Sequence, residues 1–151
     1  MRCWTRALGE TTIGPMTTLA LDLARSVADA VIAAAHEQGA AISVVVVDAR
    51  GEQVLAARMD GARGFTQTVA LAKARSAVHM GSDSGELAGL KADYPELIDL
   101  IGDHAGFRVT TLPGALVVRR GDAVLGAVAV SGAHPDVDVA CARAGVAVWL
   151  A

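Results

Sequence analysis

Four polar side chains between residues 58 and 73 have the types and spacing that could bind or transform a small molecule. Arg58 and Lys73 are cations that could neutralise the carboxylate of a small organic acid, and an arginine can do so with two parallel hydrogen bonds. Asp60 could move a proton, and Thr66 carries a hydroxyl that can donate or accept a hydrogen bond. Gly61 and Gly64 end the strand predicted before them, ahead of the helix that carries Thr66 and Lys73. We therefore expect these four side chains to gather at one end of a sheet.

Each of these side chains also has an ordinary structural explanation. Arg58 could pair with Asp60 or with a neighbouring subunit, and Lys73 could be a solvated helix residue. Asp60 could serve only the turn, and Thr66 is placed to cap a helix by accepting an orphan backbone N–H. Ser131, at the end of a predicted strand, could bind a ligand or cap the entrance to the last helix. The sequence leaves both interpretations open.

Four histidines could supply an iron ligand or a proton carrier: His36, His79, His104 and His134. None of them lies in a His-x-x-x-His or Cys-x-x-Cys arrangement. His104 is flanked by glycines in a predicted loop and is our preferred functional histidine, as an axial iron ligand or as a catalytic residue. His36 and His79, the alternatives, are predicted near helix ends, where the negative end of the helix dipole also favours an imidazolium. His134 begins a segment with two aspartates that resembles a hard-metal cluster, although helix capping explains the aspartates more simply.

The hydrophobic pattern predicts the elements that must position these side chains. Helical periodicity predicts helices over residues 18–38, 66–79, 95–101 and 136–150, with a short helical turn at 87–90. β-Branched and alternating runs predict strands over residues 42–47, 52–58, 107–111, 115–120 and 123–131. Hairpin connections indicate a largely antiparallel sheet with helices packed against it, an α/β protein of the α+β type in the order α-β-β-α-α-β-β-β-α.

Composition bounds the class of protein. The 151 residues fit one domain over residues 16–151, and residues 1–15 lack periodicity, so we expect them to be a disordered extension or an alternative start. Hydrophobic residues make up 53% of the chain and aromatic residues only 3%, so the core must be aliphatic. The net charge of −3 argues against nucleic-acid binding. No apolar run is long enough to span a bilayer or to serve as a signal peptide. The two cysteines lack metal-binding spacing and make a poor disulfide framework. Together these observations favour a cytoplasmic protein.

Three motifs together resemble the HbpS/GlcG family. They are R-M-D-G-A at 58–62, K-A-R-S-A at 73–77 and G-A-V-A-V-S-G at 126–132, with Asp138 beyond. That family includes haem-binding and haem-degrading-type proteins, the GlcG proteins of glycolate operons and the C-terminal domain of PduO. The resemblance covers nearly all of residues 16–151. It implies a profilin-like fold with a five-stranded antiparallel sheet flanked by helices, and a homo-oligomer, often a tetramer or octamer. It also implies haem or a corrinoid as the ligand.

Three positions depart from the family pattern. Pro113 stands where the family usually has the first of two glycines, and a proline lacks the backbone donor that this glycine could offer. Ala129 replaces a glycine, and Ser76 replaces a threonine but keeps the hydroxyl. These changes concern the identity of the ligand more than the fold.

Three functions are compatible with these observations. The first is binding of haem or a related tetrapyrrole, with Arg58 and Lys73 at the propionates and an imidazole on the iron; the low aromatic content counts modestly against it. The second is a cofactor-free enzyme acting on a small organic or aromatic acid, with Arg58 and Lys73 binding the acid and His104 or Asp60 moving a proton. The third is an assembly role, in which Ala- and Val-rich faces form subunit contacts. We place haem binding slightly ahead.

Overall fold

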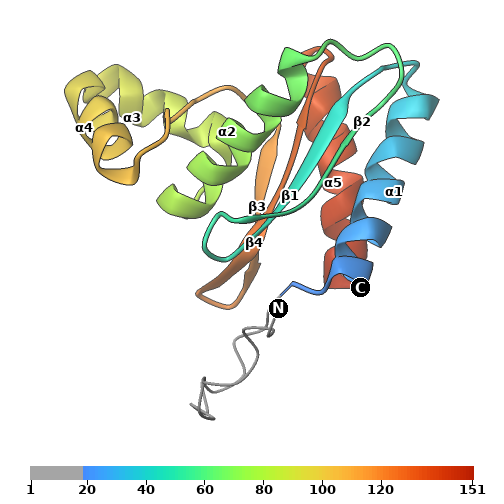
Figure 1. Cartoon of the computed structure of the whole chain (residues 1–151). Helices are drawn as coiled ribbons and strands as arrows, with labels where there is room; N and C mark the ends of the chain where they lie inside the picture. The colour runs from blue at the N-terminus through green and yellow to red at the C-terminus, as the bar shows by residue number, and fades with distance from the viewer. Residues whose placement is uncertain (1–18) are drawn as a thin grey trace, which may run out of the picture.

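The computed structural model describes residues 19–151, so the expected extension over residues 1–15 lies outside the described part. The elements follow the chain as shown in Figure 1. They are α1 (Leu21–Glu37), β1 (Ser43–Asp48), β2 (Gln53–Arg58), α2 (Phe65–Met80), the 3₁₀ turn η1 (Ser84–Glu86), α3 (Leu87–Asp93), α4 (Pro95–Ala105), β3 (Ala115–Arg120), β4 (Ala123–Ser131) and α5 (Pro135–Leu150).

The four strands of the described chain form one antiparallel sheet in the order β2-β1-β4-β3. Helices α1 and α5 pack together on one face of the sheet, and α2 covers the other face (Figure 1). Strand β1 lies in the interior of the sheet, and its residues 44–47 are fully buried. Its uninterrupted valines therefore reflect a strand that is covered on both sides.

Helix α2 packs on its face of the sheet mainly through alanines. Ala70, Ala74 and Ala77 form a buried cluster with small residues of the strands, including Ala127 and Ala129. Small side chains on both sides let the helix axis approach the sheet closely. Lys73, in the middle of α2, is thereby brought close to the backbone of β4.

The predicted fifth strand, over residues 107–111, is wrong. The backbone of this segment and of Leu112, which follows it, bonds to buried serines of neighbouring elements. The Thr110 N–H donates to Ser76 Oγ at 2.9 Å, and the Leu112 carbonyl accepts a hydrogen bond from Ser84 Oγ at 2.7 Å. These side chains satisfy the backbone groups that a strand neighbour would otherwise have to satisfy.

The observed order is α-β-β-α-α-α-β-β-α, so the predicted order is also wrong. The expected turn at 87–90 is the start of helix α3, which adds a helix before α4, and the strand predicted at 107–111 is absent. The α+β class and the antiparallel pairing are confirmed. Within residues 19–151, none of the helices has the combination of length and apolarity needed to cross a bilayer.

Helices α3 and α4 stand to one side of the sheet (Figure 1). They share a small hydrophobic cluster of their own, built on Leu87, Ile98 and Val109. Phe107, which follows α4, packs against this cluster. The α3–α4 pair is therefore joined to the rest of the molecule through a core that is separate from the two cores of the sheet.

Candidate functional site

A polar row crosses one end of the sheet. The register places Arg58 of β2 opposite Ser43 of β1, and Ser43 opposite Ser131 of β4. Directly opposed residues point to the same face, and so do residues two apart along a strand. Val45 packs with the alanines of α2, so the Arg58–Ser43–Ser131 row faces the α2 layer.

A cavity of about 650 Å³ opens at this end of the sheet, and we call it the sheet-end cavity. It lies where α1 and β4 end and where α2 and α5 begin. Two of the predicted ligand-binding residues, Thr66 and Ser131, line it together with Arg63. The remaining lining residues are Gln38, Gly39, Ala40, Ala41, Gly61, Ala62, Phe65, Gly132, Ala133 and Val137.

The prediction that Thr66 caps α2 is wrong, because Thr66 is the second residue of that helix. Its buried hydroxyl donates to the Arg63 carbonyl at 2.6 Å and lies 2.8 Å from Ser43 Oγ. A hydroxyl has one proton, so Ser43 must donate to Thr66. Both hydroxyl protons of this relay are thus committed within the protein.

Lys73 is buried, with 3% of its surface exposed, and forms an ion pair. Its ammonium donates to Asp138 Oδ2 at 3.1 Å and to the Val130 carbonyl at 2.9 Å. The other oxygen, Asp138 Oδ1, accepts from the Ala133 N–H at 3.0 Å. The pair therefore joins α2 to α5 and holds the chain between β4 and α5, which is one wall of the sheet-end cavity.

Burial acts on both members of this ion pair. It lowers the pKa of Lys73 below its ordinary value, and the Asp138 carboxylate opposes that shift. It raises the pKa of Asp138 above its ordinary value, against the opposing effects of Lys73 and of the Ala133 and Gly132 N–H groups. In both residues removal from water favours the neutral form, and the partner charge is what keeps the ions stable.

The Lys73 side chain has room to reach its partners because the residue before β3 is a glycine. Gly114 has a φ of +128°, and a Cβ there would lie 2.5 Å from the Val130 oxygen and 2.7 Å from Lys73 Nζ. No side chain fits at this point. Pro113, which departs from the family pattern, precedes Gly114. The departure therefore does not affect the position at which no side chain would fit.

The other predicted residues of this group lie outside the sheet-end cavity. Arg58 donates from Nη1 to the Ala62 carbonyl at 2.9 Å, which braces the loop between β2 and α2. Asp60 is exposed on that loop and does not line the cavity. The four side chains expected to gather therefore divide into one cavity-lining residue, Thr66, one loop brace, one exposed acid and one buried cation.

The histidines are exposed and separate from one another. The prediction of a loop at His104 is wrong, because helix α4 continues to Ala105 and His104 lies in its last turn. His36 and His79 lie in the last turns of α1 and α2, as predicted. His134 caps α5 by accepting the Asp136 N–H at 3.4 Å. Among residues 19–151, no group of three or more His, Cys, Asp or Glu is arranged to hold a metal ion.

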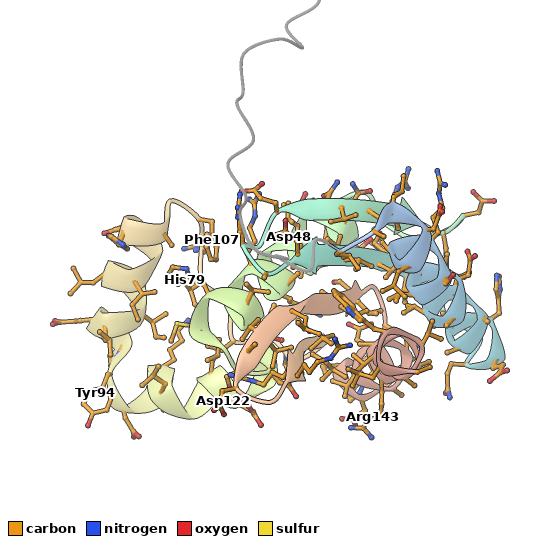
Figure 2. All side chains as sticks on the ribbon, turned by 90° about the horizontal axis from the view of Figure 1, so that it is seen from below. Asp48, His79, Tyr94, Phe107, Asp122 and Arg143 are labelled. Atoms are coloured by element: carbon orange, nitrogen blue, oxygen red, sulfur yellow. The ribbon has the colours of Figure 1, made fainter. Side chains whose placement is uncertain are left out.

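A second cavity, of about 530 Å³, lies at the opposite end of α2, and we call it the hairpin cavity. The β1–β2 turn contributes Arg50, the last turns of α2 contribute Arg75 and His79, and the segment after α4 contributes Phe107. His79 and Phe107 meet edge to face, with ring centroids 5.9 Å apart (Figure 2). Arg75 also donates from Nε to the Gly51 carbonyl at 3.3 Å, which fixes its base against the turn.

The sequence interpretation missed Arg50 and Arg75. Arg75 lies four residues before His79, so the helical period did place both on one face of α2. Nothing in the local pattern indicated that the β1–β2 turn and the end of α4 would meet that face. A third cavity, of about 630 Å³, lies between α4 and residues 106–109 and has no histidine in its lining.

Comparisons with known proteins agree with this architecture. A family model described as "Haem degrading protein HbpS-like" matches residues 19–147. The chain belongs to this family. The crystal structure of HbpS is 34% identical, with a TM-score of 0.81, over 94% of this chain and 97% of that one. The predicted resemblance is thereby confirmed.

Two further structures extend the HbpS-like comparison. A crystal structure of a PduOC–haem complex is 25% identical, with a TM-score of 0.76, over 87% of this chain and 94% of that one. The Klebsiella pneumoniae protein ORFY is 29% identical, with a TM-score of 0.79, over 88% of this chain and 91% of that one. No curated protein sequence matches the chain.

Proposed function

We propose that this HbpS-like protein binds haem or a related tetrapyrrole in the hairpin cavity, with His79 as the iron ligand. One observation carries the proposal: a single cavity is lined by an imidazole, two guanidinium groups and an aromatic ring. His104, the histidine preferred from the sequence, lines none of the three cavities described. The axial role is therefore assigned to the alternative His79.

The residues of the hairpin cavity fit the chemistry of haem. A neutral imidazole is a common axial ligand of haem iron. Arg50 and Arg75 can each bind a propionate carboxylate through a guanidinium fork. The rest of the lining is one acid, Glu52, and small or apolar residues, among them Val78 and Phe107, which suit a flat macrocycle. A volume of about 530 Å³ falls within the usual range of small-molecule sites, roughly 300–1,000 Å³.

The role of the protein in this proposal is to bind and orient the ligand. Haem would supply redox chemistry at its iron when bound. His79 would fix the iron side, the two arginines would fix the propionate edge, and Phe107 would hold the His79 ring in its edge-to-face orientation. The family description and the haem complex of the related PduOC support this assignment.

The second hypothesis, an enzyme acting on a small acid, required Arg58 and Lys73 to act together. Lys73 is engaged in the Asp138 ion pair and Arg58 is bonded to the Ala62 carbonyl, so this pair of cations has no common cavity. The observation therefore favours haem binding over that particular mechanism. A homo-oligomer and a cytoplasmic location stay predictions.

A haemin titration of the full chain, followed by absorbance, tests the proposal. We expect a saturable, shifted Soret band, and His79→Ala should weaken binding by roughly tenfold or more and change the band position. His104→Ala is the matched control, because His104 is also an exposed histidine in the last turn of a helix, and it should bind like the parent protein. A parent titration without saturation, or a response equal in both variants, would refute the assignment.

A further inference from the structure

We infer that the sheet-end cavity is a separate binding site for a small organic carboxylate. This site shares no lining residue with the hairpin cavity, so it goes beyond the proposed haem binding. Four features carry the inference: an uncommitted hydroxyl on a buried residue, a helix start without a side-chain cap, a lining arginine and a fixed wall.

The hydroxyl of Ser131 is the first feature. Ser131 is only 6% exposed and lines the cavity. Its nearest neighbour in the polar row, Ser43, donates to Thr66, and Thr66 donates to the Arg63 carbonyl. No hydrogen-bond partner for the Ser131 hydroxyl exists among residues 19–151. Ser131 as a residue is more than nine-tenths buried, and no buried polar atom lacks a partner among residues 19–151, so its unbonded hydroxyl is accessible from the cavity. A hydroxyl presented in this way is the kind of group that a ligand satisfies.

The start of α2 is the second feature. This helix has 16 residues, and no side chain caps its N-terminus. Its first two residues, Phe65 and Thr66, line the cavity. The N-terminus of a helix presents backbone N–H groups and a positive dipole end, and both favour an anion. The Thr66 N–H donates to the Arg63 carbonyl at 3.0 Å, so the other N–H groups of the first turn would have to bind the anion.

The charge of the lining is the third feature. Arg63 lines the cavity one residue before the N-cap of α2, and none of the lining residues is acidic. Of the acids adjacent along the chain to lining residues, Glu37, Asp60 and Asp136 are exposed and Asp138 is paired with Lys73, and none of the four lines the cavity. The guanidinium fork and the helix N–H groups together match the two oxygens of a carboxylate.

The rigidity of the opposite wall is the fourth feature. Asp138 holds the Ala133 N–H, and Lys73 holds both Asp138 and the Val130 carbonyl on either side of Ser131. The next residue, Gly132, approaches β1 so closely that a Cβ would lie 2.7 Å from the Ala41 oxygen. The Ser131 hydroxyl is therefore carried on a backbone that is fixed before any ligand arrives, which lowers the entropic cost of binding.

The carboxylate assignment follows from combining these features. Arg63 and the α2 N-terminus would bind the two carboxylate oxygens, and Ser131 would bind a further oxygen of the ligand or one of the same two. Thr66 is a positioning residue, because its proton holds the Arg63 carbonyl and its hydroxyl is held by Ser43. The volume of about 650 Å³ is large enough for an aromatic acid.

Amide chemical shifts of the ¹⁵N-labelled full chain would test the inference, with benzoate as the probe and benzamide as its uncharged analogue. Benzoate should shift the amides of Phe65, Gln67 and Gly132 saturably, and benzamide should not. Arg63→Gln and Ser131→Ala should each weaken benzoate binding by about tenfold. The matched controls, Arg25→Gln and Ser26→Ala on the outer surface of α1, should bind benzoate like the parent protein.

Three outcomes would overturn the assignment. Absence of saturable shifts with benzoate would remove the site, and equal shifts with benzamide would remove the charge requirement. Inorganic phosphate that displaces benzoate and binds more tightly would replace the carboxylate by a phosphate ligand. Because the haemin titration reports on His79 and not on these amides, failure of either assignment leaves the other to stand on its own result.

Discussion

The two ends of α2 differ in how their polar groups are used. Toward its N-terminus, Thr66 and Lys73 are buried and bonded to other parts of the protein. Toward its C-terminus, His79 is exposed and Arg75 is half-buried, and both line the hairpin cavity. Both polar residues of the first part therefore hold the fold. The second part has one residue of this kind, the buried Ser76, and adds two side chains that reach a cavity. A substitution that disrupts the Lys73 ion pair should therefore cost stability, and a substitution of His79 should cost binding.

Removing the counter-charge of Lys73 should have the largest effect. Asp138→Asn leaves a buried ammonium without its partner and should lower the free energy of unfolding by about 3–5 kcal/mol. Urea denaturation followed by circular dichroism measures this. Asp136→Asn, an exposed aspartate in the same first turn of α5, should leave the midpoint unchanged. Equal effects of the two substitutions would show that the ion pair is not the source of the difference between the two ends.

The pH dependence of that variant should sharpen the comparison. Without Asp138, burial alone sets the pKa of Lys73 and lowers it further, whereas a lysine in the unfolded chain titrates near its ordinary pKa of 10.5. Between these two pKa values the unfolded chain binds more protons than the folded one, so stability rises with pH. The deficit of Asp138→Asn relative to the parent should therefore narrow as the pH rises toward the ordinary lysine pKa of 10.5. A deficit that stays constant or grows over this interval would contradict a buried charged lysine.

The glycine beside Lys73 should give the next largest effect. Gly114→Ala forces a Cβ against the Val130 oxygen at a positive φ, and should cost about 2–4 kcal/mol. Gly89→Ala is the control, because that glycine lies in α3 and a Cβ added there would have no neighbouring atom within 4 Å. It should change stability by less than about 1 kcal/mol, in the stabilising direction. Thermal melts of both variants would distinguish the two cases.

The serine that replaces a strand neighbour should have a smaller effect. Ser76→Ala removes the acceptor of the Thr110 N–H and should cost about 1–3 kcal/mol, which is the usual penalty for a backbone group left without a partner. Ser76→Thr restores the hydroxyl and should recover most of the loss, since this is the residue that the family pattern predicts. Chemical denaturation measures both, and a neutral Ser76→Ala would show that another group takes over the Thr110 N–H.

His79→Ala should have the smallest effect on stability. The side chain is exposed and its one described contact is the edge of Phe107, so the loss should be within about 1 kcal/mol. The affinity for haemin, by contrast, should fall by roughly tenfold or more. A variant that lost stability and affinity together would end the contrast between the two ends of α2.

Sequence periodicity predicted most of the fold. The strands at 42–47, 52–58, 115–120 and 123–131 all appear, because valine-rich or alternating runs joined by tight turns leave few alternatives. The segment at 107–111 has the same β-like composition, yet its Thr110 N–H bonds to Ser76, and the Leu112 carbonyl that follows bonds to Ser84. A pattern of side chains cannot show that a distant serine will supply the hydrogen bond of a strand neighbour.

The candidate site was less predictable than the fold. Thr66 and Ser131 do share a cavity, because the end of a strand and the start of a helix lie at the same end of this sheet. The sequence offered two interpretations of Lys73, a ligand contact and a solvated helix residue. The side chain is instead buried and paired with an aspartate. Its partner, Asp138, is 65 residues away, and only the packing of α2 and α5 on opposite faces of the sheet brings the two together.

The separate core of α3 and α4 has a consequence for the hairpin cavity. A unit held by a small cluster of its own can open without disturbing the sheet, and amide hydrogen exchange detects such openings as locally low protection. Ala105, Gly106 and Phe107 belong to the end of this unit and also form one wall of the cavity. Ligand binding and closure of the unit are then thermodynamically linked. A ligand in the hairpin cavity should therefore slow amide hydrogen exchange throughout α4, including at residues that do not line the cavity.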